Sequence, residues 1–268
     1  MKEELVRHIV ARIERDFDSL RADFESDKCV TAKSVAIDEL LPQELAFRIA
    51  EAFPQPSEMR LLDSFREKKH TSKSIDIFDP LITDIVFAFQ DERVIGIVSR
   101  LTGLRDAHGD PHLYAGGISS MSKGHFLNPH LDNSHDHDQK NYRVLNLLYY
   151  CTPDWGPGNG GNLELWDEKV RTPLEIPSLF NRLVLMGTND RSYHSVSKVK
   201  AEGSRRCVSN YYFSPHSPNP YETSHVTYFK ARPEQRIMRF ITEVDSMVRM
   251  VARSFFKKGF AKKDLYEG

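Results

Sequence analysis

The region between residues 110 and 214 is the part of the chain that most limits how it can fold. Short runs rich in Tyr, Val, Leu and Ile follow one another there, and Gly, Asn, Asp and Pro interrupt them. Many short strands separated by turn signals are typical of a β-sandwich or a β-barrel. We predict a mainly β core with strands over residues 112–120, 125–131, 143–150, 162–166, 182–186, 193–199 and 205–213.

Helical patterns precede this β-rich region. Apolar residues spaced three and four apart predict an amphipathic helix over residues 3–24. A β-like stretch at residues 30–37 leads to a second expected helix over residues 42–53, which opens on a proline. A third helix is predicted over residues 80–104, with Gly103 as its stop signal. These elements are expected to flank the β core.

We expect the 268 residues to form a single domain. Its parts are a helical or mixed N-terminal flank over residues 1–110, a β core over residues 111–215 and a C-terminal helical extension over residues 216–268. The extension is predicted because a helical pattern resumes at Pro233.

Charge and cysteine content narrow the class of protein. The chain has 37 Lys and Arg against 38 Asp and Glu, for a net charge of −1, so no overall field attracts nucleic acid. The three scattered cysteines, Cys29, Cys151 and Cys207, predict no disulfide framework and favour a reducing compartment. No signal peptide or membrane-spanning run is recognisable. We therefore expect a cytoplasmic protein without integral membrane association, and the oligomeric state stays open.

Three residues of the β region have the chemistry of a metal site. Residues two apart on a strand point to the same face, so His130 and Asp132 can present a nitrogen and an oxygen to one point. His194, at the start of a later strand, can supply a third ligand. The histidine- and aspartate-rich stretch 135–138 is expected to be a polar loop rather than a second metal site, because strand geometry ends near Asn133.

The proposed ligand set favours Fe(II). Two neutral imidazoles and one carboxylate on one face of an octahedral ion form the facial triad of iron oxygenases, which leaves positions open for a cosubstrate and O2. Zinc is the alternative, because the same ligands serve hydrolases that activate a water molecule.

A pair of adjacent arginines follows His194. A dicarboxylic cosubstrate that chelates iron must bury its distal carboxylate, and a guanidinium is a suitable partner for it. Because Arg205 and Arg206 are adjacent on a strand, only one can point into a barrel. If Arg205 does, its companions on that face are Cys207, Ser209 and Tyr211. If Arg206 does, they are Val208, Asn210 and Tyr212. We favour Arg205, because the small residues beside it leave room for a ligand.

The ordered set of these motifs resembles the prolyl hydroxylase branch of the Fe(II)- and 2-oxoglutarate-dependent dioxygenases. The resemblance covers roughly residues 112 to 213. It is carried by Phe126 to Asp132, Tyr142 to Trp155, Gly160 to Trp166, Phe180 to Met186, His194 and Arg205.

This resemblance implies a double-stranded β-helix (jelly-roll) core, with iron near the open end of the barrel. It also implies that the Tyr150 hydroxyl binds the distal carboxylate of 2-oxoglutarate beside the arginine. A tyrosine that often contacts the cosubstrate from the strand before the HxD pair is missing here, where Ser120 and Met121 are the nearest residues.

The expected activity is hydroxylation of an unactivated C–H bond in a small-molecule or peptidyl substrate. Fe(II), 2-oxoglutarate and O2 take part, succinate and CO2 are released, and ascorbate is a possible stimulant. Because Asp132 is retained, a hydroxylase is preferred to a halogenase. The alternative is a zinc-type metal-dependent hydrolase or isomerase on a β-barrel, which would not use Arg205 and Tyr150.

Overall fold

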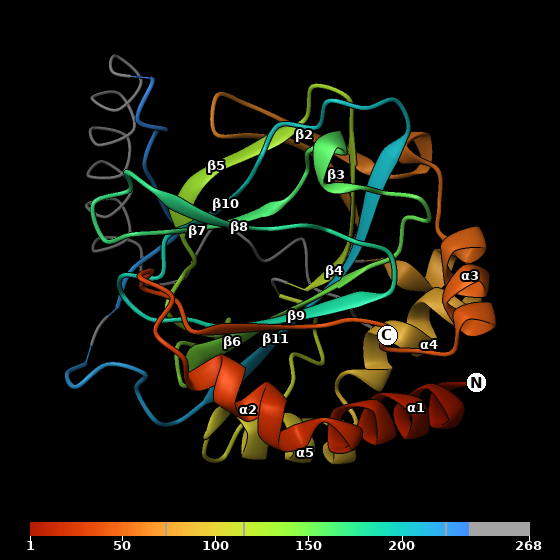
Figure 1. Cartoon of the computed structure of the whole chain (residues 1–268), viewed down its shortest axis with the longest axis horizontal. Coiled ribbons are helices and arrows are strands. Elements are labelled where there is room, and N and C mark those ends of the chain that lie inside the picture. The colour runs from red at the N-terminus through yellow and green to blue at the C-terminus, as the bar shows by residue number, and fades with distance from the viewer. Residues whose placement is uncertain (73, 115, 223, 236–268) are drawn as a thin grey trace.

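The computed structural model describes residues 1–235 apart from residues 73, 115 and 223. In this part of the chain, strands curve into an antiparallel barrel, and five α-helices gather along one side of it (Figure 1). The helices are α1 (Lys2–Arg15), α2 (Phe17–Glu25), α3 (Gln43–Ala52), α4 (Pro80–Ala88) and α5 (Glu92–Thr102), with short 3-10 turns at Pro56–Glu58, Ile75–Ile77 and Pro157–Asn159.

Among the described residues, twelve strands form one continuous antiparallel sheet. They are β1 (Ser34–Ile37), β2 (Arg60–Asp63), β3 (Glu67–Ser72), β4 (Gly117–Ser122), β5 (Phe126–Leu131), β6 (Tyr142–Tyr150), β7 (Leu163–Trp166), β8 (Pro173–Ile176), β9 (Arg182–Gly187), β10 (His194–Val196), β11 (Ser204–Ser214) and β12 (Tyr228–Phe229).

The order of the strands produces a jelly roll. It runs β1-β9-β6-β11-β4-β3-β5-β10-β7-β8, while β2 pairs with β3 and β12 pairs with β5. The strands β6, β9 and β11 lie on one side of the barrel, and β5, β7, β8 and β10 lie opposite them (Figure 1). The predicted double-stranded β-helix core is therefore confirmed, with flanking helices as expected.

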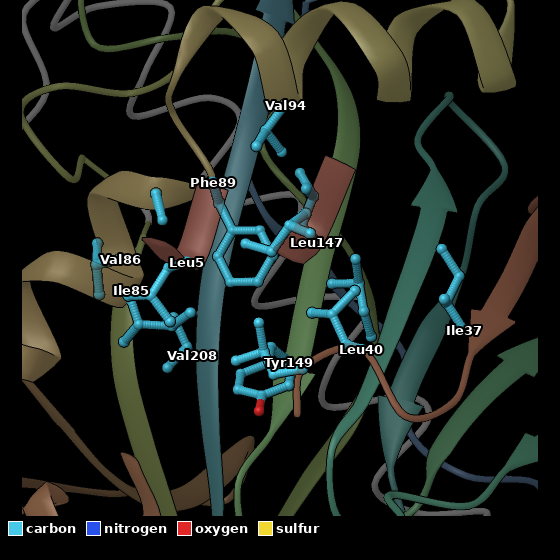
Figure 2. Close-up of a cluster of buried hydrophobic side chains, with 14 of the residues drawn as sticks. Leu5, Ile37, Leu40, Ile85, Val86, Phe89, Val94, Leu147, Tyr149 and Val208 are labelled. Atoms are coloured by element: carbon cyan, nitrogen blue, oxygen red, sulfur yellow. The ribbon is translucent and has the colours of Figure 1, made fainter. Parts of the chain in front are cut away.

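Strand alternation divides the core into two parts. Tyr149 and Val208 point outward from β6 and β11 and pack against helix residues such as Leu5, Ile85 and Phe89, as Figure 2 shows. The neighbouring Tyr150 and Cys207 point the other way and pack with other buried residues inside the barrel. The helices thus cover one face of the sheet, while the opposite face lines the interior.

The helices differ from the expected ones by being interrupted. The predicted helix over residues 3–24 breaks at Asp16, and the one over residues 80–104 breaks after Ala88. Asp91 begins the second part of the latter by accepting a hydrogen bond from the Arg93 amide. Gly103 ends it in the left-handed conformation with φ 73°, as its sequence position predicts.

Four strands, β2, β3, β8 and β12, were not among the predicted ones. Strand β3 has the sequence EKKHTS, which lacks the apolar alternation that identifies half-buried strands. Among the described residues 216–235 there is a short strand, β12, and no helix. The helix predicted after Pro233 falls on residues 236–268, outside the described part. Within that part, no helix has the length and apolar character needed to cross a membrane.

Asn181 joins the N-terminal region to the barrel. Its side chain accepts from the Leu41 amide at 3.1 Å and from the Tyr149 hydroxyl at 3.0 Å, and it donates to the Leu41 carbonyl at 2.7 Å. The residue is buried and has φ 59°, a conformation that asparagine tolerates better than alanine. These bonds therefore depend on both its side chain and its backbone.

We expect Asn181→Ala to lower the free energy of unfolding by about 2–4 kcal/mol, because three buried polar groups lose a partner. Urea denaturation would measure the change. Tyr149→Phe removes only one of the three bonds and should cost about 1 kcal/mol. A loss of unfolding free energy below about 0.5 kcal/mol for Asn181→Ala would show that these three hydrogen bonds do not stabilise the fold.

Candidate active site

Neighbouring strands bring the three predicted metal ligands together. His130 on β5 is paired directly with His194 on β10, and their ring centroids lie 4.2 Å apart. Asp132 follows β5, with Oδ1 3.5 Å from His130 Nε2 and Oδ2 3.5 Å from His194 Nε2. Within the described residues, these three form the one group of His, Cys, Asp and Glu with the spacing of a metal site, and their ligand atoms all lie within 4.8 Å of one another.

Backbone carbonyls orient both imidazole rings. His130 Nδ1 donates to the Asn128 carbonyl and His194 Nδ1 donates to the Ser192 carbonyl, each at 3.0 Å. A carbonyl only accepts, so each Nδ1 carries the proton and each Nε2 keeps its lone pair toward the centre of the group. Burial, and secondarily the nearby His130, lower the pKa of His194 to about 4. The ring is therefore neutral at pH 7, as metal coordination requires.

Asp132 is held ionised by partners on β6. Its Oδ2 accepts from Asn146 Nδ2 at 2.7 Å and lies 2.9 Å from Arg143 NH1. Burial raises the pKa of Asp132, but Arg143 and the two histidines outweigh it and hold the pKa well below its usual value. Neither Arg143 nor Asn146 is among the site residues predicted from the sequence. They are two polar side chains in an otherwise apolar strand. Because buried polar groups require partners, this pattern could have indicated that both lie beside a polar site.

The donor set fits Fe(II). Two oriented, neutral imidazoles and one ionised carboxylate supply three ligands from one side and occupy only part of an octahedral coordination sphere. The same atoms could also hold zinc.

We expect Asn146→Ala to weaken Fe(II) binding about 10-fold, because Oδ2 of Asp132 loses one of the two donors that orient the carboxylate. Anaerobic titration with Fe(II) would measure the dissociation constant. Asn210→Ala is a matched control. Asn210 is a buried asparagine on adjacent β11 whose side chain accepts from Gln90 on the helix side. Equal Fe(II) affinities in the two variants would contradict the role of Asn146.

The two adjacent arginines point to opposite faces of β11. Arg205 is buried and its guanidinium carbon lies 4.6 Å from the ring centroid of Tyr150, inside the barrel. Its Nε donates to the Gly161 carbonyl at 3.2 Å. Arg206 instead donates to the Ala50 carbonyl of α3 at 2.7 Å. The structure therefore brings Arg205, and not Arg206, next to Tyr150.

The Tyr150 hydroxyl fits a carboxylate ligand. It is fully buried, and no described residue forms a hydrogen bond with it. Burial raises the pKa of Tyr150, and the Arg205 charge only partly opposes the rise, so the hydroxyl keeps its proton and can donate it. A phenol donor beside a buried guanidinium is a suitable pair of groups for an anionic oxygen.

The loop after Asp132 does not join the triad. His135 is buried against Tyr142, with ring centroids 4.4 Å apart, and His137 pairs with Asp138. Residues 132–141 form a polar loop, as the sequence predicts.

A pocket of about 330 Å³ opens beside the end of β5. It is lined by Leu131, Asp190, Tyr193, Ser224, His225 and Tyr228. Leu131 and Tyr193 adjoin His130 and His194 in the sequence and therefore point to the opposite face of their strands, so the pocket lies on the outer side of the sheet, behind the triad.

Comparison with known proteins agrees with this geometry. The family model described as "2OG-Fe(II) oxygenase superfamily" matches residues 116–214. The chain is 34% identical over 65 residues to the hypoxia-inducible factor prolyl hydroxylase of Caenorhabditis elegans, a match that covers 24% of this chain and 9% of that protein. The chain thus spans less than a tenth of the length of this curated relative.

Two solved structures share the fold at low sequence identity. The prolyl 4-hydroxylase from Phytophthora capsici superposes with a TM-score of 0.55 at 15% identity, covering 98% of this chain and 81% of its own. A Pseudomonas putida prolyl-4-hydroxylase superposes with a TM-score of 0.51 at 15% identity, covering 74% of this chain and 99% of its own.

The part of the barrel at residues 116–214, which carries the triad, thus matches the 2OG-Fe(II) oxygenase superfamily. Its fold is shared with prolyl 4-hydroxylases of known structure.

Proposed function

We propose that the chain is an Fe(II)- and 2-oxoglutarate-dependent dioxygenase that hydroxylates an unactivated C–H bond, with release of succinate and CO2. The observation that supports this most strongly is the combination of two sites in one barrel. One is the His130, Asp132 and His194 triad, and the other is the inward Arg205 beside the Tyr150 hydroxyl, which accepts and donates no hydrogen bond within the described part of the chain.

Each residue has a defined part in this reaction. His130, Asp132 and His194 would hold the iron, which together with 2-oxoglutarate and O2 supplies the oxidising power. Arg205 and Tyr150 would bind the distal carboxylate of 2-oxoglutarate through charge-assisted hydrogen bonds. Arg143 and Asn146 would keep Asp132 ionised and oriented, and they are positioning residues rather than catalytic ones.

The alternative is a zinc-type hydrolase or isomerase with the same triad. That reaction needs no dicarboxylate, so it gives no role to a buried guanidinium packed on a buried phenol. Burying both groups costs free energy unless they have a partner. The Arg205 and Tyr150 pair therefore favours the oxygenase.

Anaerobic mixing of the protein with Fe(II) and 2-oxoglutarate tests the proposal. We expect a visible absorption band from the complex and, on admission of O2 with ascorbate, slow release of succinate even without substrate. Absence of both would reject the oxygenase. Hydrolytic activity with Zn(II) that is indifferent to 2-oxoglutarate would support the alternative.

The substrate is proposed to be a small molecule or a peptide. Proline-containing peptides are the first to test, because prolyl 4-hydroxylases share this fold. Free amino acids and small metabolites would follow in the same succinate-release assay. Stimulation by one class and not by the other would identify the substrate class.

We also propose that the protein works in the cytoplasm. All three cysteines are unpaired, and Cys151 and Cys207 are buried as free thiols, as suits a reducing compartment. Fractionation of cells would test this location.

A further inference from the structure

Strand β3 contributes a face to the interior of the barrel. It lies between β4 and β5 in the sheet. Thr71 pairs with Ser119 on β4, and Ser119 pairs in turn with Cys207, which points into the barrel from β11. Residues opposite one another in a sheet share a face, and so do residues two apart on a strand. Thr71, Lys69 and Glu67 therefore face the interior.

Lys69 lies level with Arg205 across this face. His70 pairs with Ser120, so the same register extended by one residue places Lys69 beside Met121. Met121 is in turn the partner of Arg205 on β11. Two strand spacings, about 10 Å, separate the backbones of Lys69 and Arg205. Both side chains are long enough to approach a ligand between them.

Glu67 holds Lys69 in this position. Lys69 Nζ lies 3.0 Å from Glu67 Oε2, and the two side chains are only 24% and 22% exposed. Burial raises the pKa of Glu67, but Lys69 and, more weakly, His130 outweigh it and lower the pKa below its usual value. Glu67 is therefore charged at pH 7. An ammonium has three donor hydrogens, so this contact leaves Lys69 able to bind a second anion.

The charges of Lys69 and Arg205 both act on the same buried thiol. Burial raises the pKa of Cys207, and the positive charges of Arg205 and then Lys69 oppose this rise. Cys207 pairs directly with Tyr150, whose hydroxyl has no partner among the described residues. The part of the interior that Tyr150 lines is therefore positive on two sides.

We propose that Lys69 is a second cationic binding residue for 2-oxoglutarate, which acts with Arg205 on the distal carboxylate. This inference rests on the proposed function and extends it to the selection of the cosubstrate. Two cations on one carboxylate favour a dicarboxylic 2-oxo acid over a monocarboxylic one. Glu67 keeps Lys69 oriented and compensates its charge when the carboxylate is not bound.

The test compares Lys69→Met with the wild-type protein in anaerobic titrations of the Fe(II)-loaded chain. We expect the dissociation constant for 2-oxoglutarate to rise about 10- to 100-fold, the effect of losing a hydrogen bond between charged groups. The constant for 2-oxopentanoate, which has a methyl group in place of the distal carboxylate, should not change. Fe(II) affinity should also stay constant, which shows that the site remains folded.

Lys68→Met is the matched control. Lys68 is the adjacent lysine, it points to the opposite face of β3, and it pairs with Asp63 at 2.6 Å. Its replacement should leave both ligands bound as in the wild type. Lys69→Gln would serve as a second variant if the methionine variant failed to fold.

Two results would overturn the inference while leaving the oxygenase proposal intact: an unchanged 2-oxoglutarate affinity in the Lys69 variants, or an equal loss for both 2-oxo acids. Failure of the wild-type protein to bind 2-oxoglutarate would instead reject the proposed function, and this inference with it.

Discussion

Replacement of Asp132 by alanine is expected to abolish Fe(II) binding and also to destabilise the metal-free protein by about 3 kcal/mol. The second effect arises because Arg143 is buried, with 2% of its side chain exposed, and loses the carboxylate that compensates its charge. The stacking of its guanidinium 4.0 Å from the ring centroid of Tyr211 supplies only part of that compensation.

Denaturation in the presence of a chelator would measure this loss without a contribution from bound metal. The double variant Asp132→Ala, Arg143→Met should recover much of the stability, because the unpaired charge is gone, and it should still bind no iron. His130→Ala is the control, because it removes a metal ligand without leaving a buried charge unpaired. A metal-free Asp132→Ala protein as stable as the wild type would show that Arg143 does not depend on this ion pair.

Replacement of Arg205 by methionine is expected to raise the dissociation constant for 2-oxoglutarate about 100-fold and to leave Fe(II) binding in place. The guanidinium lies inside the barrel beside Tyr150, so its loss leaves the distal carboxylate with a weaker set of donors. Tyr150→Phe removes a neutral donor and should cost about 10-fold. Anaerobic titration of the Fe(II) protein would measure both.

Arg206→Met is the matched control for this experiment. Its guanidinium contacts the Ala50 carbonyl and lies 5.9 Å from the ring centroid of Phe53, on the helix side of the sheet. We expect a small loss of stability and no change in 2-oxoglutarate affinity. In the reverse outcome, Arg206→Met weakens 2-oxoglutarate binding and Arg205→Met does not. That result would reject the proposed carboxylate site.

The apolar strands of the barrel were predictable because their side chains are buried on both faces, against the helices on one and in the barrel interior on the other. Strand β6 alternates between the helix side, with Leu147 and Tyr149, and the interior, with Leu148 and Tyr150. That burial produces the recognisable apolar run at 144–150, which only Asn146 interrupts. Strand β3 had no such signal, because Glu67 and Lys69 line a polar part of the interior where charged side chains can pair.

The candidate site was predictable in part. The spacing of His130 and Asp132 indicates a shared face, and His194 was recognised from its place at the start of a later strand. Arg143 was not recognised, because its role depends on a contact between β6 and the residue that follows β5. Contacts between strands depend on register and curvature, which short sequence patterns do not specify.

By itself the sequence determined the strand periodicity, the mainly β core and the set of residues able to bind a metal, since these follow from local chemistry and spacing. Only the tertiary structure decided that Arg205 points inward and Arg206 outward, that Arg143 neutralises Asp132 and that Lys69 lies level with Arg205. The physical reason is that the helices cover one face of the sheet. Which side chain of an alternating strand meets them is decided by how distant segments pack together.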